Sequence, residues 1–219
     1  MNGILFIYCA GGVGREVCDI AERVNQKHKK WSEICFIDDT KEYGEFYGKK
    51  VINYKEFSLK YKPDQVEIVL ANGEPFYRKE LMSKVINDRY NLATIIDDSA
   101  IISPTAKIGQ GVIIYPNVFI SSNANIKENA LLYNYVTVAH DSIVGVNTVV
   151  SINTSIGGYA TVGDNCFLAM GSLIRDRIKI GDNTVIGMGA VVCKDAVNNS
   201  VYIGNPARKI RENINGTIW

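Results

Sequence analysis

The hydrophobic and polar positions of this chain follow two different repeat patterns, and the change from one to the other falls near residue 93. Up to Leu92, short apolar runs alternate with stretches whose apolar residues have helical spacing. This alternation is typical of a parallel α/β unit, in which strands and helices take turns along the chain. It predicts a truncated Rossmann-like parallel sheet over residues 1–93, with strands at 4–9, 34–37 and 66–71 and helices at 13–24, 54–60 and 75–89.

Beyond this point an aliphatic residue recurs at every sixth position, from Ile96 to Val192. A small or β-branched residue stands four places after each of them, and Ile178 is the one large side chain in that set. Because side chains alternate along a strand, the two positions of each hexad point to the same side of the chain. A helix would instead repeat at about 3.6 residues. The repeat therefore predicts a solenoid of short parallel strands over residues 94–208, followed by a C-terminal tail at 209–219.

The remaining two positions of each hexad are the predicted corners of the solenoid. They lie two and three residues after each aliphatic residue, and Gly, Asn and Asp are common there, as in Asp164-Asn165 and Asp182-Asn183. These residue types tolerate the backbone dihedrals of a turn. Side chains at the corners are therefore expected to point outward, away from the core.

Charge and cysteine usage limit which binding partners and which cell compartment are expected. The 24 basic and 23 acidic residues leave almost no net charge, so neither a nucleic-acid partner nor an anionic membrane surface is expected. The apolar run 2–10 is too short for a membrane span or a signal peptide. The five cysteines are scattered without a CxxC spacing, which favours free thiols in a reducing cytoplasm over disulfides or a metal site.

Only two histidines are present, and they stand in different settings. His28 lies in a lysine-rich stretch, where a solvated surface histidine is expected. His140 occupies a predicted corner, so its imidazole should point outward, where it can serve as a general base or remain a plain surface residue. The neighbouring Asp141 can orient that imidazole, or it can be a turn aspartate that bonds its own backbone.

A second group of candidate residues stands where the first three strands are predicted to end. Gly11, Gly12 and Gly14 follow a strand and open a helix, which suits the binding of a phosphate by backbone N–H groups or a tight turn for helix packing. Val17 occupies the place of the last glycine of a dinucleotide fingerprint, so an NAD-dependent enzyme is disfavoured. The carboxyl ends of the next two strands add Asp38, Asp39 and Asn72 as candidate nucleotide-binding residues.

Four segments carry a resemblance to a known family: 10–14 (AGGVG), 36–39 (FIDD), 139–141 (AHD) and 204–207 (GNPA). The chain resembles the hexapeptide-repeat acetyltransferases, and among them the family of sialic acid O-acetyltransferases and nucleotide-linked amino-sugar N-acetyltransferases. The resemblance implies a left-handed parallel β-helix, acetyl-CoA as co-substrate, a homotrimer and no metal. It also implies that His140 is the general base and that Asp141 is its partner.

The resemblance further implies a place for acetyl-CoA in the coils beyond His140 and along the terminal loop. Many relatives carry a second histidine near the thioester, at the position that is Val149 here, so a backbone N–H of Gly157 or Gly158 would have to replace it. Arg78 matches a basic position of relatives, but we expect it to be solvated, as helix arginines usually are. The implied acetyl-CoA residues are Gly158, Met170, Gly171, Met188, Arg208 and Lys209, the last two being an exposed basic tail in the alternative interpretation.

The resulting functional prediction is N-acetylation of a nucleotide-linked amino sugar, a UDP- or dTDP-linked 4-amino-4,6-dideoxyhexose, in the cytoplasmic synthesis of surface glycans. O-acetylation of a sialic acid type sugar is the alternative enzyme function, and a non-catalytic binding solenoid is the alternative outside enzymes. Left-handed β-helices that are carbonic anhydrases need three histidines around a metal, and the repeat half has only His140.

Overall fold

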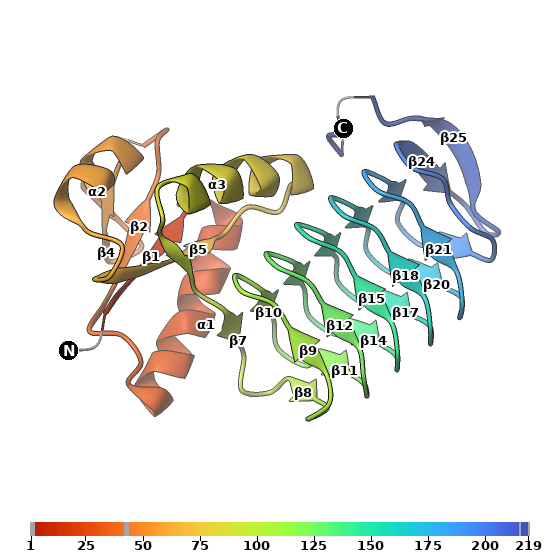
Figure 1. Ribbon diagram of the computed structural model, residues 1–219, viewed down its shortest axis with the longest axis horizontal. Helices are drawn as coiled ribbons and strands as arrows, with labels where there is room; N and C mark the ends of the chain where they lie inside the picture. The colour runs from red at the N-terminus through yellow and green to blue at the C-terminus, as the bar shows by residue number, and fades with distance from the viewer. Residues whose placement is uncertain (1–2, 42–43, 215, 219) are drawn as a thin grey trace.

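The computed structural model describes residues 3–41, 44–214 and 216–218. The chain forms an α/β part followed by a long prism of stacked coils, and the two parts lie end to end (Figure 1). The predicted fold class, a Rossmann-like parallel sheet followed by a left-handed parallel β-helix, is confirmed.

The α/β part is a sheet with helices on both faces. Its strand order is β3-β4-β2-β1-β5-β6, and the three strands predicted from the sequence lie parallel at its centre. Helix α1 packs on one face of the sheet, whereas α2 and α3 pack on the other. The predicted elements are therefore present, with ends that differ by a few residues: β1 (Ile4–Tyr8), α1 (Gly12–His28), β2 (Glu33–Ile37), α2 (Tyr54–Lys60), β5 (Val66–Leu70) and α3 (Pro75–Asn87).

Three short strands of the α/β part were not predicted from the sequence. β3 (Gly44–Phe46) and β4 (Lys49–Ile52) form an antiparallel hairpin at one edge of the sheet, and β6 (Asn91–Leu92) lies at the other edge. The hairpin turns at Tyr47-Gly48, where both residues have positive φ (54° and 69°), as its tight turn requires. Two lysines open β4, so its apolar run is only Val51-Ile52, too short to signal a strand.

The prism consists of two-residue strands separated by tight corners. Parallel pairing joins each strand to the one three strands later, which gives three sheets along the prism and one face for each sheet. A hairpin closes the far end: β24 (Ser200–Ile203) and β25 (Arg208–Glu212). The strands of the prism are β7 (Ile95–Ile96), β8 (Ile101–Ile102), β9 (Lys107–Ile108), β10 (Ile113–Ile114), β11 (Phe119–Ile120), β12 (Asn125–Ile126), β13 (Leu131–Leu132), β14 (Thr137–Val138), β15 (Ile143–Val144), β16 (Val149–Val150), β17 (Ser155–Ile156), β18 (Thr161–Val162), β19 (Phe167–Leu168), β20 (Leu173–Ile174), β21 (Lys179–Ile180), β22 (Val185–Ile186) and β23 (Val191–Val192).

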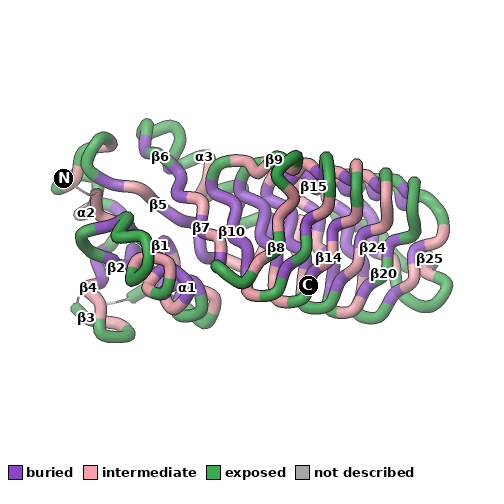
Figure 2. The backbone as a smooth tube through the Cα atoms, turned by 90° about the horizontal axis from the view of Figure 1, so that it is seen from below, coloured by how far each residue is buried: buried purple, intermediate pink, exposed green. Residues whose placement is uncertain are grey.

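The six-residue pattern accounts for the core of the prism. The aliphatic residues and the small residues four places later form one continuous buried cluster, and Figure 2 shows the buried strands inside a rim of exposed corners. Inward hydroxyls are satisfied by the next coil: Ser142 Oγ donates to the Gly157 carbonyl (2.8 Å) and Thr148 Oγ1 to the Gly163 carbonyl (2.8 Å). Such bonds remove the cost of burying a polar group.

The corners lie at the predicted positions and have a regular backbone. The second corner residue has positive φ at every sixth position from Gly111 to Gly189. Asn and Gly hold most of these positions, because they adopt the left-handed region at little cost. Three corner columns result, and we name two of them: the His140 corner (122–123, 140–141, 158–159 and 176–177) and the Met170 corner (134–135, 152–153, 170–171 and 188–189).

The faces between the corners differ in what covers them. The face made by β10, β13 and β16 packs against α1 through residues such as Ile113, Leu131 and Val149. The face made by β11, β14, β17 and β20 lies between the Met170 and His140 corners, and we name it the open face. Its outward side chains include Phe119 and Leu173, which are 42% and 45% exposed. Thr137 and Ser155 lie between them in β14 and β17, so a face of mixed apolar and polar side chains is left uncovered by the described residues beside His140.

Arg78 joins the two parts, and our expectation that it is solvated was wrong. Its side chain is fully buried between α3 and the prism. Its guanidinium donates to the carbonyls of Leu70 (2.6 Å) and Asn72 (3.0 Å) and to both the carbonyl and the side-chain oxygen of Asn129 (2.6 Å each). Burial lowers the pKa of Arg78 to about 10, so the group stays charged at neutral pH.

Arg78→Ala should therefore destabilise the protein strongly. The substitution leaves buried carbonyls without donors, and each such loss costs about 1–3 kcal/mol. We expect the free energy of unfolding in urea to fall by about 3 kcal/mol or more. The matched control is Lys79→Ala on the exposed side of the same helix, expected within about 0.5 kcal/mol of wild type. Equal stability of the two variants would contradict the assignment of Arg78 as the joint.

Candidate functional site

His140 and Asp141 form a hydrogen-bonded pair on one corner of the prism. His140 Nδ1 lies 2.9 Å from Asp141 Oδ2, and the imidazole is 53% exposed. An ionised carboxylate can only accept, so Nδ1 must carry the proton, and Nε2 of the neutral ring is then an acceptor. Nε2 has no hydrogen-bond partner among the described residues. The pair can therefore take a proton from a group that approaches from outside the corner.

Asp141 is held in place by the corner itself. It occupies the positive-φ position (57°), and Asn123 in the preceding coil donates to its Oδ1 (3.2 Å). The hydrogen bond from His140, followed by the one from Asn123, keeps the pKa of the Asp141 carboxyl below its ordinary value. The carboxylate is thus ionised at neutral pH and can stabilise an imidazolium. Asp141 thus occupies the turn position, and the hydrogen bonds described for its carboxylate go to His140 and Asn123 rather than to its own backbone.

Gly158 lies directly beneath the imidazole, in the next coil of the same corner. A Cβ at this position would lie 2.9 Å from His140 Nε2 and 3.0 Å from Cε1, closer than real Cβ contacts. The absence of a side chain therefore gives the ring its space. Gly157 N–H donates to the Ile174 carbonyl (2.9 Å), whereas Gly158 N–H has no partner in the described part of the chain. Of the two glycines, Gly158 is the one with an available donor.

The glycines of the N-terminal segment divide into structural and open positions. A Cβ on Gly14 would lie 2.2 Å from the Cys9 carbonyl oxygen, so this glycine permits the close packing of α1 against β1. Gly11 and Gly12 have nothing within 4 Å of a Cβ and stand at the start of α1. The two interpretations of this cluster thus apply to different residues: Gly14 serves helix packing, and the backbone at Gly11 and Gly12 is left open.

The two aspartates at the end of β2 are engaged by protein donors. Asp38 accepts from Ala10 N–H (2.7 Å) and from Thr40, so it braces the glycine segment. Asp39 accepts from the Tyr8 hydroxyl (2.6 Å) and from Lys84 (3.2 Å), and its side chain is 45% exposed. Hydrogen bonds outweigh desolvation and lower the pKa of both carboxyls. Both are therefore ionised acceptors, and Asp39 is the more accessible one.

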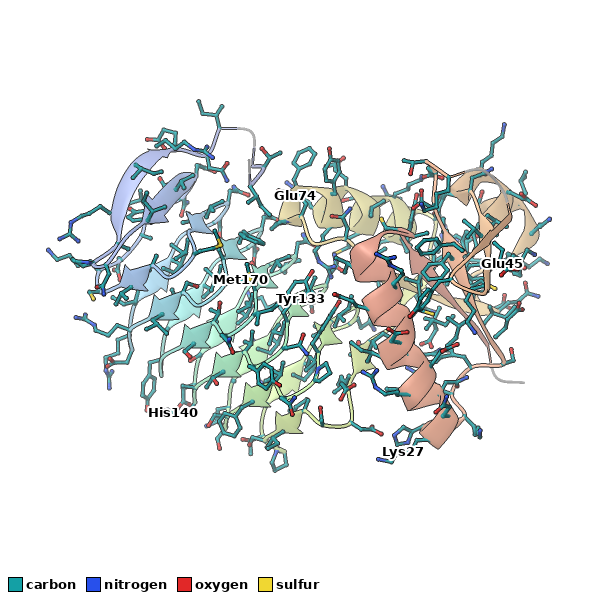
Figure 3. All side chains as sticks on the ribbon, turned by 180° about the vertical axis from the view of Figure 1, so that it is seen from behind. Lys27, Glu45, Glu74, Tyr133, His140 and Met170 are labelled. Atoms are coloured by element: carbon teal, nitrogen blue, oxygen red, sulfur yellow. The ribbon has the colours of Figure 1, made fainter. Side chains whose placement is uncertain are left out.

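A cleft of about 510 Å³ lies where the α/β part meets the prism. Gly12, Gly73 and Glu74 line it from the α/β side, and Tyr133 and Ile152 from the prism. Asn72 stands beside it, where its side-chain oxygen accepts from Glu74 N–H (2.9 Å). Figure 3 shows Tyr133 and Glu74 on this side of the molecule and His140 at a distance from them, on the lower edge of the prism.

The residues expected to bind acetyl-CoA do not lie together on this chain. Gly158 stands beside His140, whereas Met170, Gly171 and Met188 lie on the Met170 corner, across the open face. The two methionines are 48% and 66% exposed. In the terminal hairpin, exposed strand β25 contains Arg208 and Lys209, and Lys209 Nζ pairs with the Glu212 carboxylate (2.5 Å).

The position of the relatives' second histidine is not a surface position here. Val149 is fully buried in β16, where it packs in the cluster that includes α1. It is therefore on a different face from His140 and takes no part in the His140 corner.

Several further features concern the described residues only. They contain no group of three or more His, Cys, Asp or Glu side chains arranged to hold a metal ion. None of their helices is long and apolar enough to cross a bilayer. All five cysteines are free thiols, and burial raises the pKa of Cys9 and Cys18 to about 11 and of Cys35 and Cys166 to about 12.

Solved structures resemble nearly the whole chain. PerB from Caulobacter crescentus, in complex with CoA and GDP-perosamine, is 22% identical with a TM-score of 0.87, over 96% of this chain and 98% of that one. WeeI from Acinetobacter baumannii AYE is 25% identical with a TM-score of 0.87, over 94% and 99%. The acetyltransferase domain of PglB from Neisseria gonorrhoeae FA1090 is 23% identical with a TM-score of 0.70, over 95% and 100%. No curated protein sequence matches.

The fold and the corner site define a hexapeptide-repeat protein, a β-helix with an outward histidine-aspartate pair behind a small α/β domain. Residues 91–217 match the family described as GMPPB C-terminal domain, which covers more than half of the chain, and residues 4–85 match PglD N-terminal domain. The chain therefore belongs to the GMPPB C-terminal domain family and joins its β-helix to a PglD-type N-terminal domain. The resemblance inferred from the sequence motifs is confirmed.

The assignment of the glycines gives a prediction on stability. Gly14→Ala forces a methyl group against the backbone at Cys9 and should lower the free energy of unfolding by about 3 kcal/mol or more. Gly12→Ala places the same methyl group in open space and should stabilise the protein by about 0.5 kcal/mol, because alanine restricts the unfolded chain. Urea titration of both variants is the measurement. If Gly12→Ala were the more damaging substitution, the division of roles would be refuted.

Proposed function

We propose that this protein transfers the acetyl group of acetyl-CoA to the amino group of a nucleotide-linked amino sugar. The observation that carries the proposal is the His140–Asp141 pair, with Nε2 unpartnered above Gly158, on the fold of PerB. PerB was solved with CoA and GDP-perosamine, and the PglB acetyltransferase domain with acetyl coenzyme A. These ligands support the same two substrate classes for this chain.

The proposed chemistry uses His140 as a general base. The amine of the sugar attacks the thioester carbonyl, and Nε2 accepts the amine proton as the C–N bond forms. Asp141 stabilises the resulting imidazolium through Nδ1–H. The Gly158 N–H is the proposed donor to the oxyanion of the tetrahedral intermediate. The C–S bond then breaks, and the CoA thiolate takes the proton from the imidazolium.

Residues 1–93 are the proposed nucleotide-sugar-binding domain, and residues 94–208 the acyltransferase domain. Exposed N–H groups at Gly11 and Gly12, at the positive end of α1, suit the diphosphate. Asp39 and Asn72 suit ribose or base, and Asp38 braces the segment that binds the diphosphate. The proposed sugar is a 4-amino-4,6-dideoxyhexose for surface glycans. UDP and dTDP are the nucleotides proposed from the sequence, and GDP is added because PerB was solved with GDP-perosamine.

We infer a homotrimer in which the site is completed by a neighbouring copy. On one chain His140 and the cleft beside Gly12 lie apart, and the open face, with exposed Phe119 and Leu173, separates His140 from the proposed acetyl-CoA residues Met170, Gly171 and Met188. A second copy packed on that face would cover Phe119 and Leu173 and bring complementary parts of the site together. Arg208 and Lys209 at the terminal hairpin are the proposed contacts for the phosphates of CoA. Five free thiols agree with a cytoplasmic location.

His140→Ala should abolish the activity. A general base contributes about 100- to 10,000-fold, so a loss of that order is expected in acetyl-CoA-dependent thiol release with UDP-, dTDP- and GDP-linked 4-amino-4,6-dideoxy sugars. His28→Ala is the matched control, since His28 is the other histidine and pairs with Asp98 on the surface (3.1 Å), away from the corner.

The possible outcomes separate the enzyme functions. Turnover that survives in His140→Ala would remove His140 from its catalytic role. Wild-type turnover with sialic acid and none with amino sugars would replace N-acetylation by O-acetylation. No thiol release with any acceptor would favour a binding solenoid without catalytic activity.

A further inference from the structure

Tyr159 packs directly on the imidazole of His140. It follows Gly158 at the same corner, one coil further along the prism. The two ring centroids are 5.1 Å apart, and the rings are nearly perpendicular at 88°. The backbone N–H of Tyr159 also donates to the His140 carbonyl (3.0 Å), which fixes the register of the two coils. An edge-to-face contact of this geometry is favourable and depends on the orientation of both rings.

Arg177 continues this column in the following coil. Its guanidinium lies over the ring of Tyr159, 4.7 Å from the ring centroid. Its backbone N–H donates to the Gly158 carbonyl (2.9 Å), so this coil is hydrogen-bonded to the residue beneath the imidazole. A cation over an aromatic face restrains the ring. His140, Tyr159 and Arg177 therefore form a continuous stack along one corner.

The residues of this stack differ from the Asn and Gly that usually occupy the second corner position. The positive-φ position is Asn or Gly in most hexads from Gly111 to Gly189, and the departures are Tyr135, Asp141, Tyr159 and Arg177. Three of these four stand on the His140 corner, in successive coils. A tyrosine in the left-handed region is strained relative to asparagine, so its side chain must provide something that asparagine cannot. At position 159 the ring contacts both His140 and Arg177, which an asparagine side chain would not do.

The other contacts of His140 leave one motion of its ring unrestrained. The hydrogen bond to Asp141 holds Nδ1, and Gly158 provides a flat floor without a side chain. The imidazole can still pivot about Nδ1 into solvent, because it is half exposed. The Tyr159 ring contacts the imidazole and opposes this movement.

We propose that Tyr159 is a positioning residue that fixes the orientation of the His140 imidazole, with Arg177 holding the tyrosine ring. The role in catalysis rests on the proposed acetyl transfer, whereas the orientation of the ring does not. Tyr159→Asn keeps a residue suited to the turn and removes the ring. The variant should therefore fold, and its unfolding temperature should equal or exceed that of wild type. Tyr159→Phe keeps the ring and removes only the hydroxyl, which interacts with the Asp141 carboxylate. Because the ring makes the contact with the imidazole, this variant should keep the wild-type orientation of His140.

The first measurement needs no activity. Histidine labelling and NMR of the two imidazoles give separate signals for His140 and His28, which are assigned with the His140→Ala variant. In Tyr159→Asn we expect the His140 carbon-bound ring protons to shift and its nitrogen signals to move towards a mixture of tautomers, while His28 is unchanged. Tyr159→Phe should retain the wild-type signals. Unchanged His140 signals in Tyr159→Asn would overturn the proposal, whether or not the protein is an acetyltransferase.

The second measurement is acetyl transfer. Tyr159→Asn should lower kcat by roughly three- to tenfold with little change in the KM of either substrate, because ring orientation affects the reacting complex more than binding. Tyr159→Phe should restore kcat. A rise in KM at constant kcat would instead make Tyr159 a substrate contact and refute the positioning role. Wild-type inactivity together with the expected NMR shifts would refute the proposed function and leave the positioning of the ring intact.

Tyr135→Asn is the matched control for the backbone. Tyr135 has the same positive φ (61°) and a similarly exposed side chain, but it lies on the Met170 corner. The substitution should change the unfolding temperature in the same direction as Tyr159→Asn and leave the His140 signals unchanged. Equal shifts of the His140 signals in both variants would mean that a change of turn residue, and not the loss of the Tyr159 ring, moves the imidazole, and would overturn the proposal.

Discussion

The six-residue register of the β-helix is the constraint on which the rest of this structure depends. Three hexads close one coil, so each residue lies next to the residue eighteen positions away, as Asn123 and Asp141 do. Side chains that are distant in sequence are thereby stacked at a fixed spacing. His140 lies above Gly158 and beside Tyr159 because of this register. A one-residue insertion between His140 and Gly158 would separate the imidazole from both.

The second constraint is the rigid joint between the two parts. Arg78 donates from α3 into the prism, and apolar residues of one face pack on α1, so the α/β part covers that face. The open face and the His140 corner remain uncovered. The same joint keeps the cleft beside Gly12 away from His140 within one chain. The proposed nucleotide site and the proposed base therefore lie on surfaces that the proposed trimer would bring together.

Repetition explains which features the sequence could predict. The core, the corners and the outward direction of His140 all follow from the period of six, because each hexad repeats the same physical requirement. The hairpin β3–β4 was missed since its apolar run is only two residues long, and Arg78 was misjudged because nothing in a helical pattern signals a buried cation. Tyr159 did carry a visible signal: it stands where the repeat uses Asn or Gly. The contact it makes with His140 needed the three-dimensional arrangement.

Mixing two inactive variants tests the central claim, that neighbouring copies share one site. One variant is His140→Ala. The other is Gly12→Asp, which adds a negative charge where the diphosphate is proposed to bind, at a position where a Cβ has no atom within 4 Å. If neighbouring copies share the site, co-assembled subunits should recover about one quarter of wild-type turnover, since in a random cyclic trimer that fraction of the sites combines an intact His140 with an intact Gly12. No recovery in verified mixed trimers would place both residues in the site of a single chain and contradict the account.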